Sequence, residues 1–319
     1  MLTPRENFIR FMRREGWEWI PSTVDMKRIA PALVCDHVAR GAVHQQQPYT
    51  GAPGGKDMLG VEWTYDSFNK GSMDTKPLLG DIDGLSDWEK RLTIPDAHAL
   101  DWARCAEENR EYLDTDKLVY TIMYTNYFER LISLVGFEDA AVAMIDEDYT
   151  DAVKALFDRL TDYYIELLRC YHEKLNVDYV SFHDDWGHQR GTMFSVQTHR
   201  EMILPYVSRF AAAAREMGVL VEQHSCGLIE TLIPNIIESG VDTWRGQDVN
   251  DKQALVEKYG DCFTFGVVLD APADGSEAAA EALMRKYLKM YEGRHVWFAF
   301  PGTFTDGQRE RASAVLRGR

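Results

Sequence analysis

From residue 118 to the end, the chain alternates short β-forming segments with amphipathic helical segments, and this alternation restricts the fold more than any other feature of the sequence. The predicted strands are LVYTIMYT, DYVSFHD, VLVEQHS, a short segment at 242–245, FTFGVVLD and HVWFAF. Helices are expected at 126–136, 150–175, 196–217, 228–239, 251–259, 276–292 and from 305 onward. Strict alternation of this kind implies a parallel sheet with helical crossovers.

The first 117 residues are less regular but supply two more candidate strands, at 17–21 and 61–65. A helix is expected to begin at the capping box Thr3-Pro4-Arg5-Glu6. Eight parallel strands close a barrel, so we expect a (β/α)8 TIM-type barrel with an N-terminal helical and loop extension. The whole chain, 1–319, then forms a single barrel domain, in which 1–117 contributes the first strands and 118–319 the regular units.

Two alternatives bear on this fold. An open doubly wound sheet is disfavoured, because no G-x-G-x-x-G or Walker loop follows a predicted strand. For the long loop at 43–60, two interpretations are equally good: a lid over the site, or an insertion that only decorates the barrel.

Composition narrows the class of partner. The formal net charge of −16 argues against binding to nucleic acid or to anionic membranes. The chain has neither a membrane-length apolar run nor a signal-peptide core, so we expect a cytoplasmic protein. The five scattered cysteines form no C-x-x-C pair, which indicates a reducing compartment rather than a disulfide framework.

In a barrel of this type, functional side chains lie just after the strands. An aspartate there most often caps the next helix, and an aromatic residue most often packs in the core. Arg245 has two about equally good roles: it binds a substrate carboxylate, or it forms a structural ion pair with Asp242 or Asp248. The positions after the strands are unusually polar here: Tyr124, Asn126, Tyr127, His183, Asp184, Asp185, Trp186, His188, His224, Cys226, Trp244, Arg245, Gln247, Asp248, Asp270 and Pro301-Gly302.

His224 and Cys226 lie two residues apart at the end of a strand, so their side chains can point to the same side. Imidazole and thiolate are favoured zinc ligands, and catalytic zinc normally has three protein ligands and one open position. The candidates for the third ligand stand at the finishing ends of strands: Asp184, Asp185 and Asp270. Cys262 begins its strand and so lies at the opposite end. Without a metal, His224 would bind substrate by a hydrogen bond and Cys226 would be a packed thiol.

The sequence resembles the uroporphyrinogen decarboxylase-like superfamily. The resemblance lies in FHDDWGHQRG, SVQTHREMILPYVSRF and VEQHSCGLIETLIPNIIESGVD, in the opening TPRENFIRFMRRE and in the central LGVEWTY. It covers most of the chain and is strongest at about 178–268. It implies a (β/α)8 barrel with one of two activities, tetrapyrrole decarboxylation or zinc-dependent methyl transfer to or from a cobalt corrinoid.

Two motifs separate these activities. The decarboxylases carry a propionate-binding loop of the form P-V-W-x-M-R-Q-A-G-R, and the matching region here, WEWIPSTVDMKRIAP, lacks it. The methyltransferase branch carries H-x-C as zinc ligands, which His224-Ser225-Cys226 matches. Several of those methyltransferases have a further cysteine near the carboxyl terminus, whereas this chain has none after Cys262. Members that demethylate aromatic methyl ethers use carboxylates in the zinc shell instead.

The resemblance therefore implies a methyltransferase, an O-demethylase in type, that moves a methyl group from a small methoxylated or N-methylated compound to a Co(I) corrinoid protein. Zinc, held by His224, Cys226 and Asp270, would act as a Lewis acid. His183, Asp184 and Asp185 are expected to donate a proton or to orient the ligands. The expected substrate-binding residues are Tyr124, Tyr127, Trp186 and Arg245.

The corrinoid is expected on a separate chain, because no D-x-H-x-x-G signature for cobalamin occurs here. A homodimer is compatible with such a barrel. Two other hypotheses stand beside this one. The first is a metal-free decarboxylase that uses Asp184 or Asp185 as its acid–base group, and the second is a barrel without catalysis that serves as a binding subunit.

Overall fold

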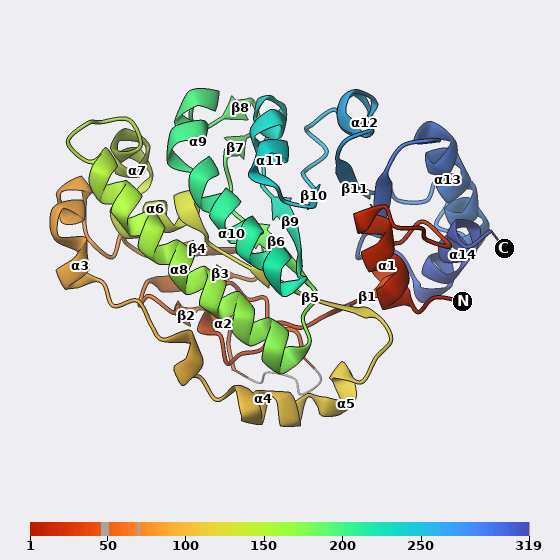
Figure 1. Cartoon of the computed structure of the whole chain (residues 1–319), viewed down its shortest axis with the longest axis horizontal. Coiled ribbons are helices and arrows are strands. Elements are labelled where there is room, and N and C mark those ends of the chain that lie inside the picture. Colours follow the sequence, from red (N-terminus) through yellow and green to blue (C-terminus); the bar gives the residue numbers. More distant parts are fainter. Residues whose placement is uncertain (46–50, 69–70, 319) are drawn as a thin grey trace.

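The computed structural model describes residues 1–45, 51–68 and 71–318. Its main sheet is parallel and curled, with the strand order β1, β5, β6, β9, β10, β11, β12 (Figure 1). A parallel bridge between Ser22 and Phe298 brings its two edges together. The strands are β1 (Met26–Arg28), β5 (Leu118–Met123), β6 (Tyr179–His183), β9 (Leu220–His224), β10 (Thr243–Trp244), β11 (Thr264–Val268) and β12 (Val296–Ala299).

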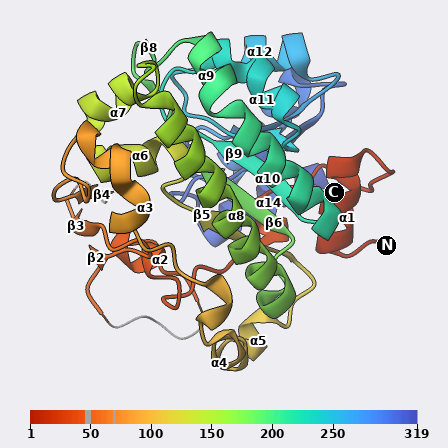
Figure 2. The same ribbon diagram turned by 60° about the vertical axis from the view of Figure 1, so that its left-hand side comes forward.

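Helices surround this sheet, as the alternating pattern predicts, and the TIM-type α/β fold is confirmed. The long helices α8 and α10 lie side by side across its outer face (Figures 1 and 2). The helices after β5 are α6 (Tyr127–Val135), α7 (Phe137–Ala143), α8 (Thr150–Leu175), α9 (Val196–Met202), α10 (Leu204–Met217), α11 (Ile233–Ser239), α12 (Lys252–Tyr259), α13 (Glu277–Met290) and α14 (Asp306–Leu316).

Two helix predictions need refinement. The predicted helix at 196–217 is divided into α9 and α10 at Ile203, because the ring of Pro205, the second residue of α10, fits the first turn of a helix but not the interior of one. The predicted helix at 228–239 starts with a short 3-10 turn, Glu230–Leu232, before α11.

The two strands expected in the N-terminal part are wrong as barrel strands. Residues 17–21 form no strand, and the chain enters the sheet later, at β1. The segment predicted at 61–65 forms β3 (Glu62–Asp66) of a separate antiparallel sheet with β2 (Gly55–Lys56) and β4 (Gly71–Asp74). The reason is its alternation of exposed and buried side chains, which suits a sheet with one solvated face rather than a barrel wall. The described part of the main sheet therefore has seven strands.

The segment between β1 and β5 also carries short helices: α2 (Cys35–Ala39), α3 (Trp88–Arg91), α4 (Trp102–Glu108) and α5 (Arg110–Leu113). Of the loop expected at 43–60, residues 46–50 lie outside the described residues, and 55–56 form β2. A buried ion pair ties this segment to the barrel, because Arg130 of α6 pairs with Asp57 beside the small sheet. Asp57 also accepts a hydrogen bond from the indole of Trp63 on β3, at 2.9 Å.

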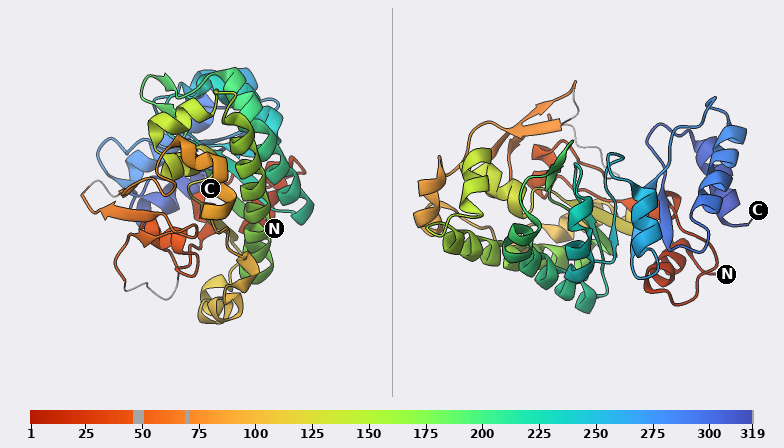
Figure 3. Two further views of the ribbon diagram at one scale, coloured as in Figure 1. Left: turned by 90° about the vertical axis from the view of Figure 1, so that its left-hand side faces the viewer. Right: turned by 90° about the horizontal axis from the view of Figure 1, so that it is seen from above.

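Helix α1 (Pro4–Arg13) covers the amino-terminal end of the barrel, and both chain termini lie at this end of the molecule beside α13 and α14 (Figures 1 and 3). Its fully buried Phe8 packs against Tyr179 and Trp297, with ring centroids 5.9 and 5.7 Å away. The capping box expected at Thr3 and Glu6 is present. None of the helices in the described part is long and apolar enough to cross a bilayer.

The packing of α1 predicts a measurable difference between two phenylalanines. Phe8→Ala removes a fully buried ring and should lower the free energy of unfolding by about 3–5 kcal/mol. Phe68→Ala is the control, because that side chain is 90% exposed and its loss should change stability by less than about 0.5 kcal/mol. Urea unfolding measures both, and equal shifts of the midpoint would contradict the assigned role of α1.

Candidate metal centre

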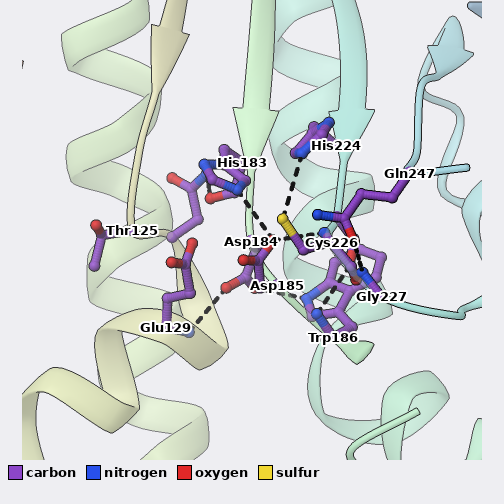
Figure 4. A network of polar contacts seen from close by, with 12 residues as sticks. Thr125, Glu129, His183, Asp184, Asp185, Trp186, His224, Cys226, Gly227 and Gln247 are labelled. Atoms are coloured by element: carbon purple, nitrogen blue, oxygen red, sulfur yellow. Dashed lines mark hydrogen bonds and ion pairs between the residues drawn. The ribbon is translucent and has the colours of Figure 1, made fainter. Parts of the chain in front are cut away.

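Two neighbouring strands bring together, at the carboxyl end of the sheet, four side chains of the types that can bind a metal (Figure 4). β6 and β9 pair in parallel with His183 opposite His224. Each histidine is followed two residues later by a second donor, Asp185 or Cys226. One ligand atom from each of these four residues lies within 4.8 Å of the others. The cluster therefore offers two nitrogens, one oxygen and one sulfur.

Asp185 connects the two strand ends. Its Oδ1 lies 3.0 Å from Nε2 of His183 and accepts a hydrogen bond of 2.6 Å from the backbone amide of Cys226. Burial opposes ionisation of Asp185, but the hydrogen bonds from His183 and Cys226 hold its pKa well below its usual range. The carboxylate is therefore charged, which is the form that binds a cation.

The ring of His224 is held in the orientation and tautomer that a metal ligand needs. Its Nδ1 lies 2.7 Å from the carbonyl oxygen of Arg245. A carbonyl only accepts hydrogen bonds, so Nδ1 carries the proton and Nε2 offers its lone pair to the cluster, 3.9 Å from Sγ of Cys226. Burial lowers the pKa of His224 to about 4, which keeps the imidazole neutral at pH 7.

A buried ion pair lies one step deeper in the barrel. Glu222, two residues before His224 on β9, accepts hydrogen bonds from Nε and Nη2 of Arg245 at 3.0 and 2.9 Å. The hydroxyls of Tyr179 and Ser181 donate to the same carboxylate at 2.7 and 2.6 Å. Burial opposes the charge of Glu222, but Arg245 and these hydroxyls hold its pKa below its usual range. The pair fixes Arg245, whose carbonyl in turn orients His224.

The sequence did not single out Glu222, although the period-two alternation of VLVEQH places it on the same face as His224. The two partners considered for Arg245 are wrong as ion pairs. Asp242 accepts a hydrogen bond from the amide of Val221, and Asp248 pairs with Lys252. Arg245 pairs with Glu222 instead.

Asp184 lies outside the cluster because it points to the other face of β6. It is fully buried and accepts hydrogen bonds from the amides of Phe128 and Glu129 at the start of α6, and from the indole of Trp186. Burial raises its pKa to about 7. Its contacts are those of a residue that holds the start of a helix.

The aromatic residues expected around the substrate separate into two groups. Tyr124 stands at the end of β5 with its ring edge-on to His183, the centroids 5.4 Å apart. Tyr127 is fully buried and its hydroxyl bonds Thr161, while Trp186 packs at 4.5 Å from the ring of His199. Tyr127 and Trp186 are therefore core residues, and Tyr124 borders the cluster.

Asp270 is exposed and does not join the cluster. It follows β11, which is separated from β9 by β10. Strands in a sheet are about 4.8 Å apart, so this end lies two strand spacings from His224. The carboxylate of Asp270 instead accepts a hydrogen bond of 2.9 Å from the hydroxyl of Tyr287. Asp185 occupies the place beside His224 and Cys226.

The turn after Cys226 depends on a glycine. Gly227 has φ +80°, and a Cβ built on it would lie 2.1 Å from the carbonyl carbon of Gly187 in the opposite turn. Its amide donates to Oε1 of Gln247 at 2.9 Å (Figure 4). The close approach of the two turns thus requires glycine, and it sets the direction in which Cys226 leaves its strand.

This contact predicts a large effect of Gly227→Ala on the cluster. Gly16→Ala is a matched control, because Gly16 has φ +83° and nothing within 4 Å of an added Cβ. Both variants pay about 1–2 kcal/mol for the left-handed conformation. Gly227→Ala must in addition separate the turns at Gly187, so it should be clearly less stable in urea and bind divalent metal more weakly. Equal behaviour of the two variants would contradict this contact.

Three comparisons with known proteins were informative to different degrees, and the family profile and one solved structure agree with this architecture. The profile of the family described as uroporphyrinogen decarboxylase (URO-D) matches residues 128–299. No curated protein matches the chain by sequence. A solved methyltransferase from Methanosarcina mazei has 15% identity, covers 100% of this chain and 99% of its own, and superposes with a TM-score of 0.69. An endo-beta-1,4-xylanase from Gloeophyllum trabeum has 10% identity over 65% of this chain and 69% of its own, with a TM-score of 0.38.

The methyltransferase therefore shares the fold of this chain along its whole length. The URO-D profile extends from the start of α6 to the end of β12 and includes all four residues of the cluster. It spans more than half of the sequence, and the chain belongs to the uroporphyrinogen decarboxylase family.

Proposed function

We propose that the protein is a zinc-dependent methyltransferase that moves a methyl group from a small methoxylated or N-methylated compound to a Co(I) corrinoid carried by a partner protein. The observation that carries this proposal is the cluster of His183, Asp185, His224 and Cys226 at the carboxyl end of the barrel strands. Active sites of TIM-type barrels lie at this end. The methyltransferase from Methanosarcina mazei has the same fold.

The donor set fits zinc. Nitrogen, sulfur and carboxylate oxygen are the ligands that this ion prefers, and a catalytic site uses three of them and leaves one position open. His224, Cys226 and Asp185 would hold the ion. In this proposal Asp185, which lies beside the other two residues, takes the role that the sequence-based hypothesis gave to Asp270. When bound, zinc supplies a Lewis acid toward the heteroatom that bears the methyl group.

The proposed reaction also needs a proton, which a side chain beside the cluster can supply. The methyl carbon leaves toward Co(I) without the electron pair of its bond, so the heteroatom keeps that pair and takes up a proton. His183 is the residue placed to give it, because it borders the cluster and is not needed as a third ligand. Burial opposes the charge of His183, but Glu129 and Asp185 raise its pKa well above the usual range. The ring of Tyr124 packs edge-on against it.

Metal analysis of the purified protein tests the first part of the proposal. We expect close to one zinc per chain in the wild type and its loss in His224→Ala and in Cys226→Ser. The matched controls are His188→Ala and Cys262→Ser, both exposed and outside the cluster, and they should keep the metal. No zinc in the wild type after reconstitution would overturn the mechanism and favour a metal-free decarboxylase that relies on Asp185.

The second part is tested by single-turnover reaction with a reduced corrinoid. Zinc-loaded protein, incubated with methoxylated and N-methylated compounds and Co(I) cobalamin, should convert the Co(I) absorption spectrum to that of methylcobalamin. His183→Gln should lower the rate roughly 100-fold, a typical contribution of a general acid, with zinc content unchanged. Carbon dioxide release from carboxylated substrates without any cobalt would contradict the proposal.

A further inference from the structure

The turn between β5 and α6 contains a strained residue beside the metal cluster. Thr125 has φ +59°, in the left-handed region. A side chain branched at Cβ is an outlier there, because it crowds the backbone. Thr125 is buried, and it lies on the side of His183 that faces away from Cys226 (Figure 4). Strained backbone of this kind persists only where the surrounding structure imposes it, and it is concentrated at functional sites.

The other two non-glycine residues with positive φ in the described part of the chain have an ordinary explanation. Arg14 is the C-cap of α1 and Asn176 is the C-cap of α8, and a left-handed residue is common where a helix ends. Thr125 ends no helix. It follows β5 and directly precedes Asn126, the N-cap of α6. The strain at Thr125 is therefore not explained by helix capping.

Contacts with the hydroxyl and the carbonyl of Thr125 hold the turn in this conformation. Its Oγ1 accepts a hydrogen bond of 3.0 Å from Nη1 of Arg40, the C-cap of α2. Arg40 is itself fixed by an ion pair with Glu129 of α6, at 3.3 Å. The carbonyl oxygen of Thr125 accepts a hydrogen bond of 3.3 Å from the hydroxyl of Tyr164 on α8. Glycine would adopt this φ without strain, but it would lack the hydroxyl that binds Arg40.

The residues on either side of Thr125 both contact His183. The ring of Tyr124 packs edge-on against the imidazole, with the centroids 5.4 Å apart. Asn126 donates two hydrogen bonds to the carbonyl oxygen of His183, from its backbone amide at 3.3 Å and from Nδ2 at 2.8 Å. The backbone conformation of Thr125 sets the direction of one neighbour relative to the other. One neighbour therefore contacts the ring of His183, and the other holds its backbone.

We infer that Thr125 is a positioning residue for the proton donor: its hydroxyl, anchored to Arg40, locks the turn that directs Tyr124 and Asn126 onto His183. The inference rests on the proposed function for the role of His183. A general acid must lie within hydrogen-bond distance of the atom that receives its proton. A displacement of about 1 Å can therefore lower a rate roughly 100-fold. The hydrogen bonds of Thr125 go to Arg40 and Tyr164, so it acts on His183 only through its two neighbours.

Three substitutions separate the hydroxyl of Thr125 from the strain of its backbone. Thr125→Ser keeps the hydroxyl and removes the branch at Cβ. Thr125→Val keeps the branch and the shape and removes the hydroxyl, whereas Thr125→Gly removes both the hydroxyl and the strain. Stability should follow the backbone, so Thr125→Gly should melt at a higher temperature than Thr125→Val. Positioning should follow the hydroxyl, so these two variants should share one defect and Thr125→Ser should behave as the wild type.

Histidine NMR reports the surroundings of His183 without any methyl transfer. In zinc-loaded protein with isotopically labelled histidine, the Hε1 signal of His183 is the one that His183→Gln lacks, and Tyr124→Leu gives its shift without the neighbouring ring. At one pH, we expect this signal to keep its wild-type position in Thr125→Ser. In Thr125→Gly and Thr125→Val it should move toward its position in Tyr124→Leu. Asn176→Gly is the control, because it changes an exposed left-handed residue at the far end of α8 and should leave the signal in place.

Single-turnover methyl transfer to Co(I) cobalamin gives the second readout. At a saturating concentration of methyl donor, Thr125→Gly and Thr125→Val should both react roughly 10-fold more slowly than the wild type, because the proton donor is less precisely held. The half-saturating donor concentration and the zinc content should stay unchanged, since neither the metal ligands nor the donor contacts are altered. Thr125→Ser and Asn176→Gly should keep the wild-type rate.

The outcomes distinguish this inference from the proposed function. An unchanged His183 signal in Thr125→Gly and Thr125→Val refutes the positioning role, whatever the methyl-transfer assay gives. A rate loss that follows the melting temperature, large in Thr125→Val and small in Thr125→Gly, also refutes it, because a merely structural role predicts that order. If the signal moves as expected but the wild type never methylates Co(I), the proposed function fails and the positioning of His183 stands. The result expected is one shared defect in the two variants without the hydroxyl, despite their different stabilities.

Discussion

The parallel pairing of β6 with β9 is the constraint on which the site depends. It sets His183 opposite His224, so the two H-x-D and H-x-C triplets finish side by side. The pleat turns the first and third residues of each triplet to one side and the middle residue to the other. A slip of one residue in either strand would bring Asp184 or Ser225 to the cluster and remove two donors. Those middle residues instead stabilise the fold. Asp184 holds the start of α6, and the Ser225 hydroxyl accepts a hydrogen bond from the amide of Trp186.

Burial makes the polar groups of the barrel interdependent. Arg245 and Glu222 compensate each other in a medium where a single charge would be costly, and the backbone of Arg245 orients His224. Above this pair, Asp185 is ionised because it accepts hydrogen bonds from both strand ends. The interior is thus organised in two levels, a compensated ion pair below and a donor set for a cation above.

The sequence predicted the features that follow from local periodicity. Alternation after residue 118 gave the parallel sheet and its helices, and the strand ends gave the rim on which His183, Asp185, His224 and Cys226 lie. It failed where tertiary contacts decide. The alternating pattern at 61–65 marks a half-buried strand but does not name its partners, and the pairing of β3 with β2 and β4 assigns it to the small antiparallel sheet. Asp270 and Asp185 are equally good carboxylates at strand ends, and only the strand order shows which one meets Cys226.

The central claim is that both triplets contribute to one metal ion, and X-ray absorption at the zinc edge tests it most directly. The account predicts a first coordination shell with one sulfur at about 2.3 Å and nitrogen or oxygen ligands at about 2.0–2.2 Å. In Cys226→Ser the sulfur contribution should disappear, and in Asp185→Ala the number of light ligands should fall while the sulfur stays. A zinc shell without sulfur in the wild type, or one unchanged by either substitution, would contradict the claim that His224, Cys226 and Asp185 hold one metal ion.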